Sequence, residues 1–418
     1  MNSWPAPELP DVQGEGHNLR IWDAGTGALT TLEPADTATM YVCGITPYDA
    51  THLGHAATYV TFDLAGRVLR DAGHPVRYVQ NVTDIDDPLL ERAERDGVSW
   101  EALAHSEIEL FHTDMAALRV IPPDHYVGVV ETMDRHIASV SALLESGAAY
   151  ALPVPPGEGG ADGAQDVYLD LGRQGTFGAV SRWDRDQMLE VFADRGGDPD
   201  RVGKRDVLDP LLWRAKRPGE PSWTGGSVSE GRPGWHIECT TIALDHLGMG
   251  FDLQGGGTDL IFPHHEMSAV QAVALTGQKP FAHAYAHQAM VAYDGEKMSK
   301  SKGNLVRVSD LRRDGVDPMA IRLVLLAQHY RTEWEYTGDL LDRATARLAA
   351  WRLALGEAGD HGAGDLIAQL RAALARDLDA PAAALAVDAW AESAPRNGRP
   401  SPQVEAALDA LLGIRLAA

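Results

Sequence analysis

The sequence contains only two cysteines, Cys43 and Cys239, among its 418 residues. Two cysteines this far apart cannot form a disulfide framework, so the chain suits a reducing compartment and we expect a cytoplasmic protein. A cysteine is about as often a small buried apolar residue as a functional thiol. Both interpretations are open for each cysteine at this point.

Long apolar runs and positive charge are also scarce. We find no apolar stretch of about 18 residues without charges, so no membrane span is expected, and the N-terminus does not resemble an export signal. The chain has 36 lysines and arginines against 60 acidic residues, a formal net charge of -24. Proteins that hold a long nucleic acid usually carry a basic surface. The charge balance therefore predicts small-molecule substrates and no tRNA partner.

The order of elements near the N-terminus predicts the fold class. Residues 40–46 indicate a strand, residues 52–71 a helix and residues 76–83 a second strand. This order predicts an α/β fold with a Rossmann-like, HUP-type parallel sheet and a nucleotide crevice at the carboxyl ends of its strands. We expect residues 88–150 to be mainly helical and the sheet to resume at 234–239.

Composition divides the chain further. A flexible loop rich in proline and glycine at 153–163 lies within a mixed tract, and the part after 305 is rich in alanine, leucine and arginine. These changes predict an insertion that splits the α/β domain and a C-terminal helical bundle. The expected units are a first half at 1–115, an inserted domain at 116–225, a second half at 226–304 and a helical domain at 305–418.

A basic loop at 296–304 stands out against the acidic background. It holds three lysines, two serines and a glycine in nine residues. Lysine ammonium groups suit a polyanion such as the triphosphate of ATP, although an exposed basic loop is the alternative for such a run taken alone. The predicted phosphate-binding loop consists of Lys297, Met298, Ser299, Lys300 and Ser301.

Two histidines mark the start of the first helix. His52 and His55 are three residues apart, so they share one helical face beside the free N–H groups of the helix N-terminus. Such a pair can donate hydrogen bonds to a phosphate as charge develops on it. Taken alone, the two could equally be surface histidines.

The two motifs together resemble those of a known family. His52-Leu53-Gly54-His55 and the lysine loop are similar to the HIGH and KMSKS motifs of class I aminoacyl-tRNA synthetases. The blocks 40–44, 81–87, 231–239 and 255–266 resemble the cysteinyl-tRNA synthetases, and the similarity covers roughly residues 18–330. Three features differ from the cysteinyl-tRNA synthetases: the short chain after Ser301, Ala56-Ala57 after the first motif, and the turn at 194–199. These departures resemble the mycothiol ligases, which join cysteine to glucosaminyl-inositol.

This resemblance implies one zinc ion at the floor of the cysteine pocket. Matched residue by residue, its ligands are Cys43, Cys239 and His264, and two thiolates with one imidazole suit tetrahedral zinc with one open position. The synthetases carry a further glutamate ligand where this chain has Ser268. Three protein ligands plus the substrate sulfur then complete the site.

The resemblance also implies an ATP-dependent, AMP-forming ligase that acts through cysteinyl-adenylate, with Mg²⁺ accompanying ATP. His52 and His55 would stabilise the α-phosphate, and Lys297 and Lys300 would bind the outer phosphates. The residues implied for the cysteinyl-adenylate pocket are Cys43, Gly44, Ile45, Thr46, Thr58, Asn81, Val82, Thr83, Trp235, Gly257, Thr258, Asp259 and Val291.

Several assignments keep alternatives. The turn formed by Arg195, Gly196, Gly197 and Asp198 is either a sugar-binding turn or a solvated one, and Trp235 taken alone would be a core residue. The acidic residues at 84–87 are expected to surround a strand end and not to bind metal. A cysteinyl-tRNA synthetase and a non-catalytic regulatory relative are the rival functions, and we expect a monomer with L-cysteine, ATP and glucosaminyl-inositol as substrates.

Overall fold

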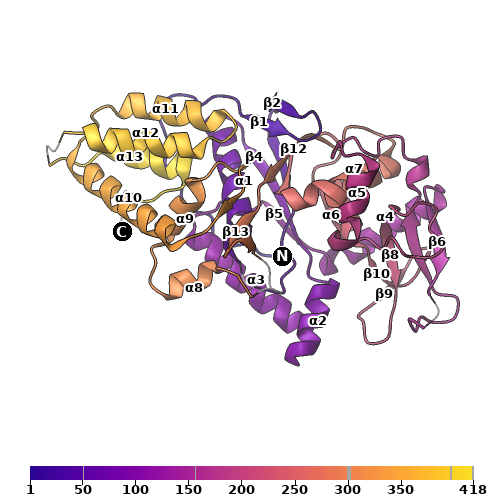
Figure 1. The fold of residues 1–418 in the computed structure, drawn as a ribbon. Coiled ribbons are helices and arrows are strands. Elements are labelled where there is room, and N and C mark those ends of the chain that lie inside the picture. Colours follow the sequence, from indigo (N-terminus) through magenta and orange to yellow (C-terminus); the bar gives the residue numbers. More distant parts are fainter. Residues whose placement is uncertain (50, 156, 299–302, 396–397, 417–418) are drawn as a thin grey trace.

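The structure, a computed structural model, describes residues 1–49, 51–155, 157–298, 303–395 and 398–416. A parallel sheet in the order β12-β11-β3-β4-β5 lies at its centre. Figure 1 shows the C-terminal helices at one end of this sheet and a second, antiparallel sheet at the other. The central strands are β3 (Ala38–Val42), β4 (Val76–Val82), β5 (His125–Gly128), β11 (Phe251–Gly257) and β12 (Ala282–Gln288).

The strand order places a crevice beside β3. The chain runs outward from β3 to β4 and β5, and later returns to β11 on the other side of β3. The carboxyl ends of β3 and β11 therefore flank a topological switch point, where ligands bind in open parallel sheets. The predicted α/β class with a parallel Rossmann-like sheet is confirmed.

Helix α1 (Leu53–Asp71) connects β3 to β4 and begins at the predicted histidine pair. His52 is its N-cap, and the Nδ1 atom of that side chain accepts a hydrogen bond from the Gly54 amide at 3.1 Å. The residues from Leu53 to Leu69 are mostly buried, because the sheet covers one face of the helix and C-terminal helices cover another. The first turn of α1 is thereby fixed beside the crevice.

The insertion forms the second sheet, in the order β6-β7-β8-β10-β9. Its strands are β6 (Ala149–Pro153), β7 (Gln165–Leu169), β8 (Leu211–Ala215), β9 (Trp223–Gly225) and β10 (Val228–Pro233). The helical elements between β4 and β10 are α2 (Asp87–Asp96), α3 (Trp100–Ala117), η1 (Val130–Thr132), α4 (Met133–Glu145), η2 (Leu171–Arg173), α5 (Arg185–Phe192) and η3 (Ala193–Arg195).

Two local expectations differ from the structure. Residues 234–239, expected as a strand, form the start of helix α6 (Trp235–His246). This helix is buried on nearly all sides, so its sequence shows no amphipathic stripe and its alternation resembles a strand. The helical expectation for 88–150 is interrupted by β5, a four-residue strand.

The domain boundaries remain a proposal, and the sheets bear on two of them. Strand β5 of the parallel sheet lies beyond the proposed end of the first half at 115. Strand β10 of the antiparallel sheet lies beyond the proposed end of the insertion at 225. A division drawn by sheet membership would place both boundaries later in the chain.

The remaining elements complete the site and the C-terminal region. The N-terminal hairpin consists of β1 (Arg20–Asp23) and β2 (Ala28–Thr31). After β11 follow η4 (Thr258–Leu260), η5 (Ile261–His265), α7 (Glu266–Thr276), β13 (Val291–Tyr293), β14 (Glu296–Lys297) and β15 (Trp334–Glu335). The C-terminal helices are α8 (Val308–Arg313), α9 (Pro318–Leu326), α10 (Gly338–Glu357), α11 (Ala363–Ala375), α12 (Ala380–Ser393), α13 (Pro402–Ala407) and η7 (Leu408–Leu412).

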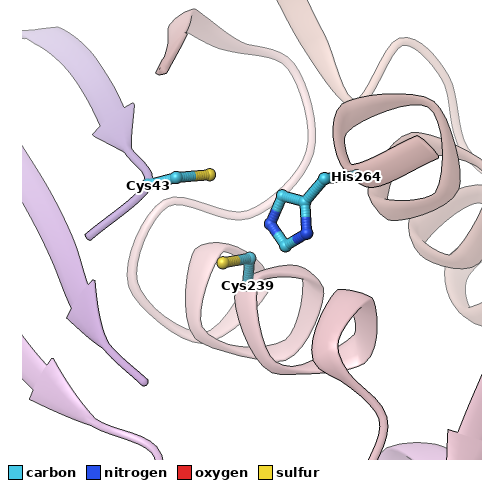
Figure 2. Close-up of side chains that lie close together, drawn as sticks. All are labelled: Cys43, Cys239 and His264. Carbon is cyan, nitrogen blue, oxygen red and sulfur yellow. The ribbon is translucent and has the colours of Figure 1, made fainter. Parts of the chain in front are cut away.

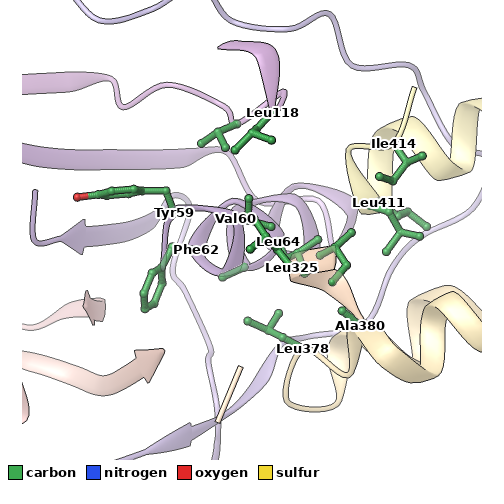
Figure 3. Packing of buried hydrophobic residues seen from close by; sticks show 14 of the residues in the cluster. Tyr59, Val60, Phe62, Leu64, Leu118, Leu325, Leu378, Ala380, Leu411 and Ile414 are labelled. Atoms are coloured by element: carbon green, nitrogen blue, oxygen red, sulfur yellow. The ribbon is translucent and has the colours of Figure 1, made fainter. Parts of the chain in front are cut away.

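The C-terminal helices share one hydrophobic core with α1. Figure 3 shows Val60 and Leu64 of α1 close to Leu325 of α9, with Leu411 and Ile414 nearby. The burial of such side chains is the main source of domain cohesion. Among the described residues, no helix has the length and apolar character needed to cross a membrane.

Candidate active site

A cleft of about 360 Å³ opens at the carboxyl ends of the central strands. The end of β3, the first turn of α1, the end of β4, the start of α6 and the residues after β11 and β12 form its walls. The predicted residues that line it are Cys43, Gly44, Ile45, Thr46, His52, His55, Thr58, Asn81, Thr83, Trp235, Cys239, Gly257, Asp259, His264, Val291 and Met298. Residues far apart in the sequence thus meet at the predicted crevice.

The three predicted metal ligands meet at the floor of this cleft. Cys43 follows β3, Cys239 lies in α6 and His264 lies in η5. One ligand atom from each lies within 4.8 Å of the other two, and all three residues are buried. Figure 2 shows both sulfur atoms and the imidazole around one common space.

The state of the three donors fits a metal ion. The Nε2 atom of His264 is buried and has no hydrogen-bond partner within the described part of the chain, whereas Nδ1 lies 3.0 Å from Nδ1 of His236. Burial and then the nearby His236 lower the pKa of His264, so its ring is neutral, as a ligand must be. Burial and then Cys43 raise the pKa of Cys239, and a bound cation would reverse that effect. Two sulfurs and one imidazole are a donor set for zinc.

Neighbouring side chains hold these donors in place. The Sγ atom of Cys43 lies 3.3 Å from Nε2 of His265, whose Nδ1 lies 2.8 Å from Nε2 of His287. Ser268, at the position of the synthetases' extra ligand, is fully buried and donates a hydrogen bond to the His236 carbonyl at 3.3 Å. Its hydroxyl is therefore used within the protein.

The histidine pair forms the other wall of the cleft. The rings of His52 and His55 stack with centroids 3.8 Å apart, and both border the cleft at the start of α1. Lys297 ends β14, and Met298 is buried against the cleft. The predicted phosphate-loop residues Ser299, Lys300 and Ser301 lie outside the described residues.

The ends of β3 and β4 approach each other closely. The Gly44 amide donates to Oδ1 of Asn81 at 2.8 Å, and a Cβ atom on Gly44 would lie 1.6 Å from the Asn81 carbonyl oxygen. Asn81 also donates to Thr83, which in turn donates to the buried Glu238. Only glycine fits at position 44, and the polar chain fixes this side of the cleft.

Two predicted pocket residues are placed differently from the rest. Val82 is fully buried in the hydrophobic core, because side chains alternate along β4 and its neighbours Asn81 and Thr83 take the cleft side. Thr258 begins η4, between the cleft residues Gly257 and Asp259. Membership of the same sequence motif did not show which residues of β4 face the cleft and which face the core.

The cleft also contains residues that the sequence analysis missed. They are Tyr48, Asp49, Gly54, Tyr59, Leu260, Gln288, Ala289, Met290 and Leu305. Gln288 ends β12 and accepts a hydrogen bond from the Thr61 hydroxyl at 2.7 Å. A strand assignment for the segment of alternating alanines at 282–288 would have placed it at the crevice.

The predicted sugar-binding turn lies next to one cleft residue, Trp235. A Cβ atom on Gly196 would be 3.7 Å from the Trp235 ring, which lines the cleft and whose centroid is 4.5 Å from that of His264. Asp198 accepts hydrogen bonds from Tyr168 and Lys204, and the Gly197 amide donates to a backbone carbonyl. Arg195 donates to two carbonyl oxygens of the segment after β11.

The acidic residues after β4 surround its end, as expected. Asp84 accepts a hydrogen bond from the Val130 amide, Asp86 caps α2, and Asp87 forms an ion pair with Arg232. In the described parts of the chain, the cluster of Cys43, Cys239 and His264 is the group of His, Cys, Asp or Glu side chains that could hold a metal. Each of these three carboxylates thus has a partner within the protein near the end of β4.

Comparison with known proteins places the chain in a family. The family described as tRNA synthetases class I (C) catalytic domain matches residues 30–346. A Kytococcus sedentarius protein named L-cysteine:1D-myo-inositol 2-amino-2-deoxy-alpha-D-glucopyranoside ligase is 58% identical, and the alignment covers 100% of both chains. Proteins of the same name from Streptomyces avermitilis and Streptomyces coelicolor are 57% and 56% identical, again over 100% of both chains.

Solved structures have a similar fold. A Mycobacterium tuberculosis methionyl-tRNA synthetase in complex with methionyl-adenylate superposes with a TM-score of 0.59 at 18% identity, covering 86% of this chain and 82% of that chain. The Agrobacterium radiobacter leucyl enzyme (LeuRS) in a ternary complex gives 0.57 at 12% identity, covering 91% and 83%. The chain therefore belongs to the class I (C) tRNA synthetase family, in the branch formed by its full-length relatives.

Proposed function

We propose that this chain ligates L-cysteine to the amino group of 1D-myo-inositol 2-amino-2-deoxy-alpha-D-glucopyranoside at the expense of ATP, in mycothiol biosynthesis. The names of relatives that are 55–58% identical over the full chain support this reaction. The observation that carries it is the cluster of Cys43, Cys239 and His264 at the floor of a cleft bordered by His52 and His55. A metal cluster that selects a thiol, next to a histidine pair that binds phosphate, fits the activation of cysteine by ATP.

Cys43, Cys239 and His264 would hold zinc. A zinc ion with three protein ligands offers its open position to a soft thiolate, which separates cysteine from serine. The other cleft residues position the substrate. Asn81 and Thr83, joined by a hydrogen bond at 3.2 Å, line the cleft together with Trp235.

The first half-reaction forms cysteinyl-adenylate. A carboxylate oxygen of cysteine attacks the α-phosphorus of ATP, and the bond from that phosphorus to the diphosphate oxygen breaks. His52 and His55 lie at the start of α1. They would donate hydrogen bonds to the α-phosphate as its negative charge increases. Lys297 and Lys300 would neutralise the outer phosphates together with Mg²⁺, and Asp259 would accept the ribose hydroxyls.

The second half-reaction forms the amide. The acceptor amine attacks the activated carbonyl carbon, the new carbon–nitrogen bond replaces the carbon–oxygen bond to AMP, and the amine loses one proton. The turn at 195–198 is the proposed acceptor side, because Gly196 lies against Trp235, which lines the cleft. All three proposed metal ligands come from one chain, so the site needs no residue of a partner subunit, and we propose a monomer; the two free cysteines support a cytoplasmic location.

One assay tests the proposal. The purified protein is mixed with ATP, Mg²⁺ and cysteine, and then offered either the glucosaminyl-inositol acceptor or tRNA while AMP and the cysteine-containing product are measured. We expect AMP and a cysteinyl amide in equal amounts with the sugar acceptor. Cysteinylated tRNA without amide would establish the cysteinyl-tRNA synthetase alternative instead, and the absence of AMP with both acceptors would favour a non-catalytic relative.

A further inference from the structure

The segment at 257–266 links both halves of the proposed site. It leaves β11 with Gly257 and Asp259, which border the cleft on the proposed adenosine side, and reaches His264 at the proposed metal cluster. Glu266 then begins α7. A displacement of this segment would therefore move the proposed ribose contact and the proposed metal ligand together.

A single arginine of the insertion holds the middle of the segment. Nη1 of Arg195 donates to the carbonyl oxygen of Asp259 at 3.1 Å and to that of Phe262 at 2.6 Å. The guanidinium carbon also lies 5.5 Å from the centre of the Trp183 ring. Hydrogen bonds from a charged donor are about twice as strong as neutral ones, so this contact fixes the segment more firmly than a neutral side chain would.

Aromatic side chains of the insertion enclose the same point. Phe262 is fully buried, and its ring centre lies 6.5 Å from that of Phe177, 5.9 Å from that of Trp183 and 6.3 Å from that of Phe192. These three neighbours all belong to the insertion. Rings at such separations favour one orientation, so Phe262 anchors the segment in the insertion.

The segment also holds the insertion in return. The carboxylate of Glu266 is fully buried and accepts hydrogen bonds from the amides of Gly178 at 2.8 Å, Val180 at 3.1 Å and Ser181 at 2.7 Å. Three convergent N–H groups satisfy a buried carboxylate that would otherwise be costly. The two contacts are reciprocal, because each side supplies one charged group to the backbone of the other.

We infer that Arg195 and Glu266 form a clamp through which the insertion sets the position of Asp259 and His264. The inference rests on the proposed function and makes both clamp residues positioning residues for the first half-reaction. Misplacement of a reacting group by about 1 Å can cost about a hundredfold in rate. Arg195 therefore acts before any acceptor binds, which distinguishes this role from a contact with the acceptor sugar.

The test uses the full-length, zinc-loaded protein and its Arg195→Ala, Arg195→Lys and Glu266→Gln variants. Arg185→Ala is the matched control, since this arginine of the insertion is 52% exposed and pairs with Asp206, which also belongs to the insertion. Two quantities are measured without acceptor: cysteine-dependent exchange between ATP and diphosphate, and the rate at which a chelator removes zinc. Circular dichroism checks that each variant is folded.

We expect Arg195→Ala to lower kcat/KM for cysteine in the exchange reaction and to accelerate zinc release, each by about 10- to 100-fold, the range typical of residues that orient metal ligands. Arg195→Lys and Glu266→Gln should fall between this variant and the wild type, and Arg185→Ala should match the wild type. Exchange and zinc release within twofold of wild type in a folded Arg195→Ala protein would overturn the clamp.

The two proposals fail in different ways. If Arg195→Ala exchanges normally but shows a raised KM for the sugar acceptor, Arg195 is an acceptor contact and the clamp is wrong. If the wild type itself shows no cysteine-dependent exchange, the proposed function is wrong. The zinc-release comparison still decides the clamp in that case, because it requires no turnover.

Discussion

A fully buried ion cluster joins α1 to the C-terminal region, and its disruption gives a prediction for stability. Asp63 accepts hydrogen bonds from Nε of Arg67 at 2.7 Å, from Arg322 of α9, and from the Ile121 amide at 2.9 Å. The side chains of Asp63, Arg67 and Arg322 have no exposed surface. Arg322 also donates to the carbonyls of Leu118 and Leu412, so the cluster spans three parts of the chain.

The change to make is Asp63→Ala. Removing one partner of a buried ion pair typically costs about 3–5 kcal/mol, because the remaining charge stays buried without compensation. Here two guanidinium groups would remain. Burial lowers the pKa of Arg322 to about 10, which still leaves it charged at neutral pH. We therefore expect Asp63→Ala to lower the free energy of unfolding by at least about 3 kcal/mol.

Urea unfolding at pH 7.5, followed by circular dichroism, measures the loss. Arg185→Ala, which breaks an exposed ion pair with Asp206, is the control and should cost at most about 1 kcal/mol. Burial opposes ionisation of Asp63, but Arg67 and Arg322 outweigh it and lower its pKa below 3.8. The cluster's contribution is therefore present above pH 3.8 and is lost on further acidification. A loss for Asp63→Ala no larger than that for the control would refute this reasoning.

Two further changes probe the cleft, and a third probes the buried Asp84 at the end of β4. Cys239→Ala should reduce zinc from about one ion per chain to none in elemental analysis and abolish cysteine-dependent exchange, since the donor set would lose one of its two thiolates. Gly44→Ala should abolish exchange, because its Cβ would lie 1.6 Å from the Asn81 carbonyl, whereas Gly175→Ala, with open space at its Cβ, should leave exchange intact. Burial raises the pKa of the Asp84 carboxyl to about 6. The stability that the protonated carboxyl contributes at low pH is therefore lost as the pH rises through 6. In urea titrations, the wild type should lose about 2 kcal/mol more between pH 4.5 and 7.5 than Asp84→Asn does.

The sequence predicted the elements whose patterns are local. The segment around α1 combines helical periodicity with a histidine N-cap, and β4 is a continuous run of strand-forming residues before a polar turn. Local patterns failed for α6, which is buried on nearly all sides, for β5, which is short, and for β12, which is built on alternating alanines. Each of these elements depends on tertiary contacts, and the hydrophobic periodicity of its residues does not identify it.

The candidate site divides in the same way. Cys43, Cys239 and His264 lie within recognisable motif blocks, so the sequence could bring them together without a structure. The partners of Arg195 and Glu266 are backbone atoms of distant residues, and a backbone carbonyl or amide carries no sequence signal. Contacts of this kind become visible only when the insertion is seen against the segment after β11.

The metal cluster also bears on how the split domain is held together. Cys43 precedes the insertion, whereas Cys239 and His264 follow it, and no single element supplies two of the three donors. The site therefore forms only when both halves of the parallel sheet have come together around the insertion. A metal ion that binds this arrangement and not the unfolded chain stabilises the junction by its binding free energy. The proposed selection of cysteine and the joining of the two halves of the sheet therefore involve the same three side chains.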